Sequence, residues 1–61
     1  MVKEGDRVEL IRMDDDQAPP IGTRGTVWLI DDMGTIHVRW DNGSGLGLIP
    51  NVDEYKIIKE E

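Results

Sequence analysis

The sequence contains no cysteine, one histidine (His37) and one serine (Ser44). Without thiols, the chain has neither a disulfide framework nor a thiolate zinc site, and it suits a reducing cytoplasm. His37 has no second imidazole with which to share a zinc ion. A triad of Ser44, His37 and Asp41 can be drawn, but these residues belong to one small hairpin that offers no pocket or oxyanion hole. We therefore expect no enzyme, no cofactor and no dedicated metal site.

Long apolar runs are absent as well. No stretch approaches the ~20 residues of a membrane helix, and the opening segment MVKEGDRVEL lacks the apolar region of a signal peptide. A chain of 61 residues makes one small domain, which must bury nearly all of its large apolar side chains. We expect a single cytoplasmic domain over residues 1–61, with its core within residues 5–58 and no membrane partner.

The charge is negative and unevenly distributed. Seven basic residues stand against thirteen acidic ones, which gives a formal net charge of −6. The acidic residues gather where turns are expected: Asp14–Asp16, Asp31–Asp32, Asp53–Glu54 and Glu60–Glu61. Basic residues fall within strand-like runs instead: Arg7, Arg12, Arg24, Arg39 and Lys56. An acidic total disfavours non-specific binding to a phosphate backbone and is typical of domains that stay soluble and monomeric.

Short runs of β-prone residues separated by turn residues follow one another along the chain, and no segment has a sustained helical period. The pattern predicts five strands, within residues 6–13, 23–30, 35–40, 45–49 and 55–58. Residues 13–22 form a long loop, because three adjacent aspartates repel one another and Pro19-Pro20 supplies no amide donors. A short helical turn is expected near residues 50–53. We predict a small closed all-β barrel, because an open sheet of this size would leave long unpaired edges.

Alternation along residues 35–40 places Ile36, Val38 and Trp40 on one face, and it turns His37 and Arg39 outward. The full set of residues that we expect to point inward is Val8, Leu10, Val27, either Leu29 or Ile30, Ile36, Val38, Trp40, Leu46, Leu48 and Ile57.

The orientation of Trp28 is left open. Gly25 suggests a bulge or sharp bend within residues 23–30, so the register there is uncertain. If Val27 points inward, Trp28 is an exposed anchor for a partner. If the bulge swaps the register, Trp28 fills a core that needs large side chains. Tyr55 has the same two alternatives.

The glycine-rich segment GSGLG, residues 43–47, does not fit a phosphate-binding loop, because it has no Lys-Ser/Thr pair and no helix after it. The segment DNGSG lacks the ligand spacing of a calcium loop, as do Asp14–Asp16, where only weak opportunistic calcium binding is left open. We interpret Asn42-Gly43 as a tight hairpin turn. Gly45 and Gly47 then keep the next strand slim where a small barrel bends.

The closing segment GLGLIPNVDEYKII, residues 45–58, resembles the strand, helical turn and strand that end SH3 domains. Gly47, Leu48, Pro50 and Tyr55 match that pattern. Ile49 stands where those domains have an aromatic residue, and their N-terminal Ala-Leu-Tyr-Asp-Tyr motif is missing. The resemblance implies a five-stranded SH3-like barrel, without carrying over the specificity for proline-rich ligands.

A longer resemblance runs from Gly5 to Ile58 and rests on five motifs: Gly5–Val8, Ala18–Pro20, Gly22-Thr23, Gly25–Val27 and His37–Gly43. The sequence resembles a bacterial domain family of unknown function that is often found on phages and mobile elements. The elements GTV and VRWDNG are also similar, over a shorter stretch, to the SH3-like barrel domain of mind-bomb and HERC-type ubiquitin ligases, which engages protein segments.

The leading hypothesis is a non-enzymatic protein- or peptide-binding module that acts as a monomer or weak homodimer. The residues expected to bind the partner are Trp28, His37, Arg39, Tyr55, Asp14, Asp15 and Asp16. The three aspartates would favour a basic partner segment.

Two alternatives remain. A nucleic-acid-associated barrel of the KOW type would need its basic side chains to converge on one outer face and to outweigh the acidic loops. Those side chains are Arg7, Arg24, Arg39 and Lys56. In the other alternative, the acidic loops imitate phosphate and occupy a nucleic-acid-binding host protein, as would suit a mobile-element protein.

Overall fold

The computed structural model describes residues 1–59, which contain four β-strands and no helix. The strands are β1 (Arg7–Arg12), β2 (Arg24–Ile30), β3 (Ile36–Trp40) and β4 (Glu54–Ile58). They form one antiparallel sheet in the order β3-β2-β1-β4. The all-β prediction is confirmed, and four of the five predicted strands are present. Residues 13–22 contain neither helix nor strand, as predicted.

The fifth predicted strand, residues 45–49, is wrong. Only Leu48 pairs with the sheet, through an isolated bridge in which its N–H and C=O bond to the Ile36 backbone at 2.7 and 2.9 Å. The indole Nε1 of Trp40 donates to the Leu46 carbonyl at 2.8 Å and so occupies an acceptor that a strand would use. The glycines on either side of Leu46 offer no side chains to pack, which weakens a strand further.

The helical turn predicted near residues 50–53 is also wrong, because the chain forms a single hydrogen-bonded turn there. The N–H groups of Val52 and Asp53 both donate to the Ile49 carbonyl, at 3.1 and 3.0 Å. The Asp53 carboxylate accepts from the Ile49 N–H at 2.9 Å. Asn51 has a positive φ of 69°, and a left-handed residue at this point prevents a right-handed helix from continuing.

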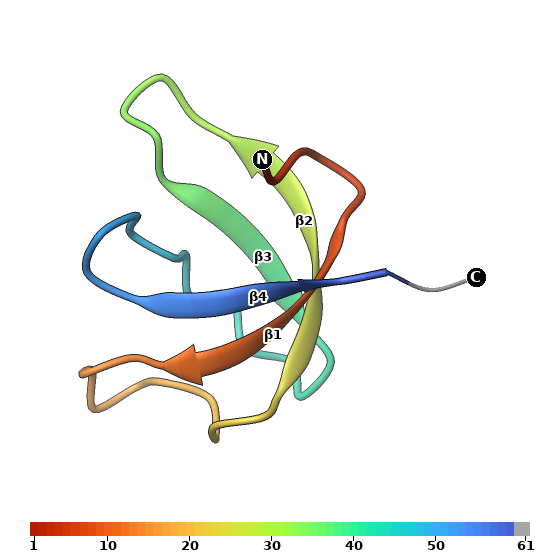
Figure 1. Ribbon diagram of the computed structural model, residues 1–61. Helices are drawn as coiled ribbons and strands as arrows, with labels where there is room; N and C mark the ends of the chain where they lie inside the picture. The colour runs from red at the N-terminus through yellow and green to blue at the C-terminus, as the bar shows by residue number, and fades with distance from the viewer. Residues whose placement is uncertain (60–61) are drawn as a thin grey trace.

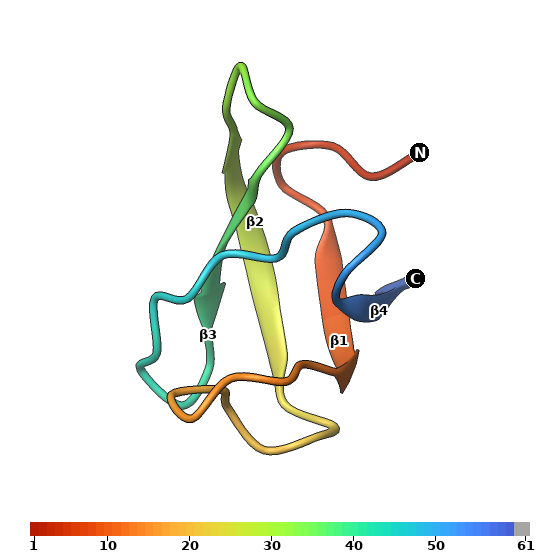
Figure 2. The same ribbon diagram turned by 90° about the vertical axis from the view of Figure 1, so that its left-hand side faces the viewer.

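The sheet is strongly curled, so that its edge strands β3 and β4 face each other (Figure 1). These strands do not pair, and the predicted closure into a barrel is therefore not found. The segment that follows β3 crosses from that strand toward β4 (Figure 2) and adds one side chain to the core. The enclosed core consists of Val8, Leu10, Val27, Ile36, Val38, Trp40 and Leu48. All seven were predicted to point inward, whereas Leu46 and Ile57 are only half-buried.

Gly25 is not a bulge, which was one of the two alternatives predicted for it. It pairs regularly with Val8 on one side and Trp40 on the other. Its role is to let β2 and β3 come close together. A Cβ added at Gly25 would lie 2.5 Å from Val38 Cγ1 and 2.7 Å from the Arg39 carbonyl oxygen, distances at which atoms clash.

The register irregularity of β2 lies three residues later, at Trp28. Val27 pairs with Val38, but the next pair is Leu29 with His37, so Trp28 is an extra residue in the ladder. The extra residue allows Trp28 and Leu29 both to face outward, 48% and 36% exposed. Ile30 then turns inward and packs against the core. Of the two alternatives for the inward residue, Ile30 is correct and Leu29 is wrong.

Charged side chains hold the ends of the strands together. Arg7 of β1 reaches past β2 and forms a two-pronged ion pair with Asp41, directly after β3, with N–O distances of 2.9 and 2.7 Å. Asp31 closes the β2–β3 turn and binds His37 Nε2 at 2.9 Å. The hydrogen bond from Arg7 lowers the pKa of Asp41. The hydrogen bond from His37 lowers the pKa of Asp31 in the same way.

We predict that Gly25→Ala destabilises the domain by about 1–3 kcal/mol, because the new methyl group overpacks the contact between β2 and β3. Urea unfolding followed by tryptophan fluorescence measures the change. Gly45→Ala is the matched control, because a Cβ there meets no atom within 4 Å and its φ is not positive. The control should stay within about 0.5 kcal/mol of the parent. Equal destabilisation by both substitutions would contradict the role assigned to Gly25.

We predict that the free energy of unfolding decreases as the pH falls below about 4. The folded-state pKa of Asp31 and Asp41 lies below the ordinary carboxylate pKa of ~3.9. Their contribution is therefore full above that ordinary value, and it is lost as the pH falls through the lowered pKa. Urea unfolding at a series of pH values measures this loss.

Asp41→Asn should lower the free energy of unfolding at pH 7 and make the acid-induced loss smaller, because the carboxylate that titrates is gone. Asp32→Asn is the control, since its side chain makes no hydrogen bond or ion pair within the part of the chain that the structure describes. It should keep both the stability and the acid sensitivity of the parent. An Asp41→Asn variant that is as acid-sensitive as the parent would count against this explanation.

Candidate functional site

The convex side of the sheet, here called the outer face, gathers basic side chains from all four strands. Strand pairing aligns Arg39 with Thr26, Thr26 with Arg7 and Arg7 with Ile58, so these residues form one row across the sheet. A second row runs from Arg24 through Glu9 to Lys56. The sequence thus brings Arg7, Arg24, Arg39 and Lys56 to the outer face, the convergence that the nucleic-acid alternative requires.

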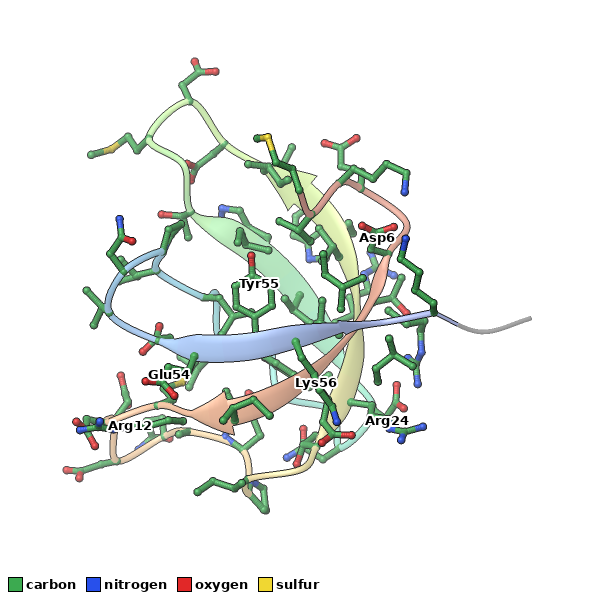
Figure 3. All side chains as sticks on the ribbon, in the orientation of Figure 1. Asp6, Arg12, Arg24, Glu54, Tyr55 and Lys56 are labelled. Carbon is green, nitrogen blue, oxygen red and sulfur yellow. The ribbon has the colours of Figure 1, made fainter. Side chains whose placement is uncertain are left out.

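Three of these four cations are paired with carboxylates on the same face. Arg7 is held by Asp41, and Glu9 lies 3.1 Å from Arg24 and 3.7 Å from Lys56, measured between the charged atoms. Figure 3 shows Arg24 and Lys56 extending from β2 and β4 toward the same region. The four cations and the two carboxylates that pair with them sum to a formal charge of +2, within a chain whose total is −6.

An aromatic and cationic cluster occupies the β2–β3 part of the outer face. We call it the Trp28 cluster, and it consists of Trp28, Leu29, His37 and Arg39. The His37 ring lies 5.6 Å from the Trp28 ring between centroids, at a tilt of 55°. The Arg39 guanidinium carbon lies 5.6 Å from the Trp28 ring centroid, within cation–π range. Three of the predicted partner-binding residues are therefore brought together in space.

Asp31 positions the histidine of the cluster. One carboxylate oxygen binds His37 Nε2 at 2.9 Å, and the other accepts the backbone N–H groups of Met33 and Thr35 at 3.0 Å each. Gly34 completes the turn with a φ of +89°. The sequence analysis did not single out Asp31 for this role. The signal in the sequence was the segment Asp31–Gly34 (DDMG), because aspartate at the start of a turn bonds to the backbone N–H two residues later.

Tyr55 lies apart from the Trp28 cluster, on the inner side of β4. It is half-buried and lines an apolar cleft of about 300 Å³ with Ile30, Ile36 and Pro50. Pro50 and Tyr55, two residues of the SH3 resemblance, thus share one cleft. Trp28 and Tyr55 are on opposite sides of the sheet and cannot contact the same short segment of a partner.

The three aspartates of the acidic loop do not join either location. Asp14, Asp15 and Asp16 are exposed, in the loop at the end of the sheet opposite the β2–β3 turn (Figures 1 and 2). Asp14 pairs with Arg12 at 3.3 Å, and the Asp15 carboxylate accepts the N–H of Gln17 at 2.8 Å. These are local contacts that shape the loop.

Neither a triad nor a metal cluster is assembled within residues 1–59. His37 is bound to Asp31, Asp41 is bound to Arg7, and Ser44 Oγ accepts the N–H of Leu46 at 3.3 Å. Across the same residues, no group of three histidine or acidic side chains could hold a metal ion. No helix long and apolar enough to cross a membrane is found there.

Comparison with known proteins identifies a family. The model of a domain of unknown function, DUF4314, matches residues 2–58. No curated protein and no solved structure matches the chain. The expected membership in a domain family of unknown function is confirmed, over almost the same residues as the resemblance found in the sequence. The chain therefore belongs to the DUF4314 family, a domain family of unknown function.

Proposed function

We propose that this domain is a non-enzymatic binding module whose outer face takes up a segment of a partner protein, with Trp28 as the anchor. The observation that supports the proposal is the indole of Trp28, which is 48% exposed although the domain has only two tryptophans for its small core. Tryptophan is among the residues that most often dominate binding energy at protein interfaces. An indole left outside such a small core is available for a partner.

The environment of Trp28 supports this role because it restricts the ring before any partner arrives. The irregularity in β2 turns the side chain outward, and His37 and Arg39 contact the ring from the neighbouring strand. Asp31 holds His37 in turn. An anchor that is already ordered loses less conformational entropy on binding, which favours affinity.

We further propose that the fold is an open variant of the SH3-like barrel. The bridge between Leu48 and Ile36 sets residues 45–49 beside β3. Together with the strand order β3-β2-β1-β4, this places five segments side by side in the order residues 45–49, β3, β2, β1, β4. Neighbouring strands of an SH3-like barrel follow the same order. The curled sheet and the shared cleft of Pro50 and Tyr55 are consistent with that relationship. The resemblances to mobile-element proteins and to the mind-bomb barrel stay predictions.

Nucleic-acid binding is the second candidate function, and the four basic residues on the outer face favour it. Two facts argue against it. Glu9 and Asp41 already form ion pairs with three of these cations, and the chain as a whole carries −6. Phosphate mimicry by Asp14–Asp16 stays a prediction, because their contacts are local.

We predict that peptides selected by display on this domain bind the outer face. Titration of the ¹⁵N-labelled domain should shift the amide signals of residues 26–29 and 36–39. Trp28→Ala should weaken binding ~30-fold, which corresponds to the ~2 kcal/mol typical of an anchor residue. Ile21→Ala removes another exposed apolar side chain, 75% exposed on the acidic loop, and should leave the affinity unchanged.

Three outcomes would overturn the proposed function: no peptide is selected, the shifts map instead to the cleft of Pro50 and Tyr55, or Trp28→Ala binds as tightly as the parent. The amide spectrum of each variant verifies that it is folded before the affinity is measured.

A further inference from the structure

We infer that the partner segment is acidic, with a carboxylate that binds Arg39 next to an apolar side chain that packs on Trp28 and Leu29. The inference rests on the proposed function and adds the chemistry of the partner. It differs from the basic partner expected from the acidic loop, because the loop lies outside the Trp28 cluster.

Arg39 differs from the other three cations of the outer face. Arg7 is paired with Asp41, and both Arg24 and Lys56 are paired with Glu9. Arg39 has no carboxylate within 4.0 Å among the residues that the structure describes, and its guanidinium lies over the Trp28 ring. Arg39 is thus the cation of this face that lacks a paired carboxylate among the described residues, while Arg24 and Lys56 share the single charge of Glu9.

The contact with Trp28 prepares Arg39 for a carboxylate. A guanidinium that lies over an aromatic ring is attracted to the face of the ring. Its N–H groups lie in the guanidinium plane and remain available as hydrogen-bond donors. These donors match the two oxygens of a carboxylate in a forked geometry. Because the ring restricts the side chain, less rotamer freedom is lost when the ion pair forms.

The residues around Arg39 determine which partner side chain fits next to the partner's carboxylate. Trp28 and Leu29 project side by side from the same irregularity in β2, and together they present apolar surface beside the guanidinium. An apolar partner side chain that covers them would remove water from the ion pair and strengthen it. The ligand that fits is therefore an acidic residue adjacent to a large apolar residue.

The same charge distribution favours a peptide carboxylate over a nucleic acid. A nucleic acid gains affinity when several of its phosphates bind cations of the protein at once. On this face, every phosphate contact other than the one at Arg39 must compete with Asp41 or Glu9 for its cation. One carboxylate needs only Arg39 and does not disturb the existing pairs.

The test begins with a random peptide library displayed against the domain. We expect the selected peptides to be enriched in Asp or Glu next to an apolar residue. The tightest acidic peptide is then compared with its counterpart in which that Glu or Asp is replaced by Gln or Asn. The parent domain should prefer the acidic form by at least ~10-fold, as for an ion pair shielded from water.

Substitution of Arg39 identifies the cation involved. Arg39→Gln should abolish the preference for the acidic peptide, whereas Arg24→Gln, which removes a cation of the same face that is already paired, should preserve it. Arg39→Lys should retain part of the preference, because it keeps the charge but loses the forked donors. Amide spectra of all three variants verify that the sheet is intact.

The outcomes separate the two proposals. If peptides bind the outer face through Trp28 but without preference for an acidic residue, or if the preference survives Arg39→Gln, the inference fails and the proposed function stands. If no peptide binds, both fail. Binding of a single-stranded oligonucleotide at ~50 mM salt that is lost at ~200 mM and depends on Arg39 would also overturn the inference, because the face would then serve phosphate.

Discussion

One extra residue in the β2–β3 ladder decides both what the domain buries and what it displays. Without the shift between Val27 and Leu29, strict alternation would put Leu29 in the core and leave Ile30 outside. With it, Val27 and Ile30 reach the core, and two consecutive apolar side chains stand on the convex side. The Trp28 cluster exists because the ladder is irregular at this one place. On its other side, β2 pairs with β1 over Arg24–Thr26, just before the irregularity.

The sequence predicts those parts of the fold that depend on neighbours along the chain. Ile36, Val38 and Trp40 alternate with outward residues, and the structure follows this pattern along β3. Gly25 was misinterpreted, because a glycine in a strand fits either a bulge or a close approach, and the deciding atoms belong to Val38 and Arg39 on another strand. The prediction of a strand over residues 45–49 was wrong for a similar reason. Its carbonyl at Leu46 is taken by the Trp40 indole, a contact that no periodicity reveals.

For the candidate site as well, the sequence predicted the features that depend on neighbours along the chain and missed those that depend on distant residues. Alternation predicted that His37 and Arg39 face outward, but it could not choose between two orientations for Trp28, because the register depends on the partner strand. The ion pair of Arg7 with Asp41 joins residues 34 positions apart, which explains why the neutralisation of the outer face was not foreseen. Tyr55 was grouped with Trp28 because both are aromatic, whereas the curl of the sheet separates them. Residue type suggested the members of the site, and three-dimensional pairing decided which of them meet.

Glu9 lies at the centre of the outer face, on β1, and restrains the cations of the strands on both sides, Arg24 on β2 and Lys56 on β4. A neutral residue at this position would release two cations at once and raise the summed charge of the four cations and their paired carboxylates from +2 to +3. The surface would then form a continuous basic band beside an exposed indole, a combination suited to single-stranded nucleic acid. A single codon change at Glu9 would therefore change the charge pattern of this face without requiring a change in the backbone.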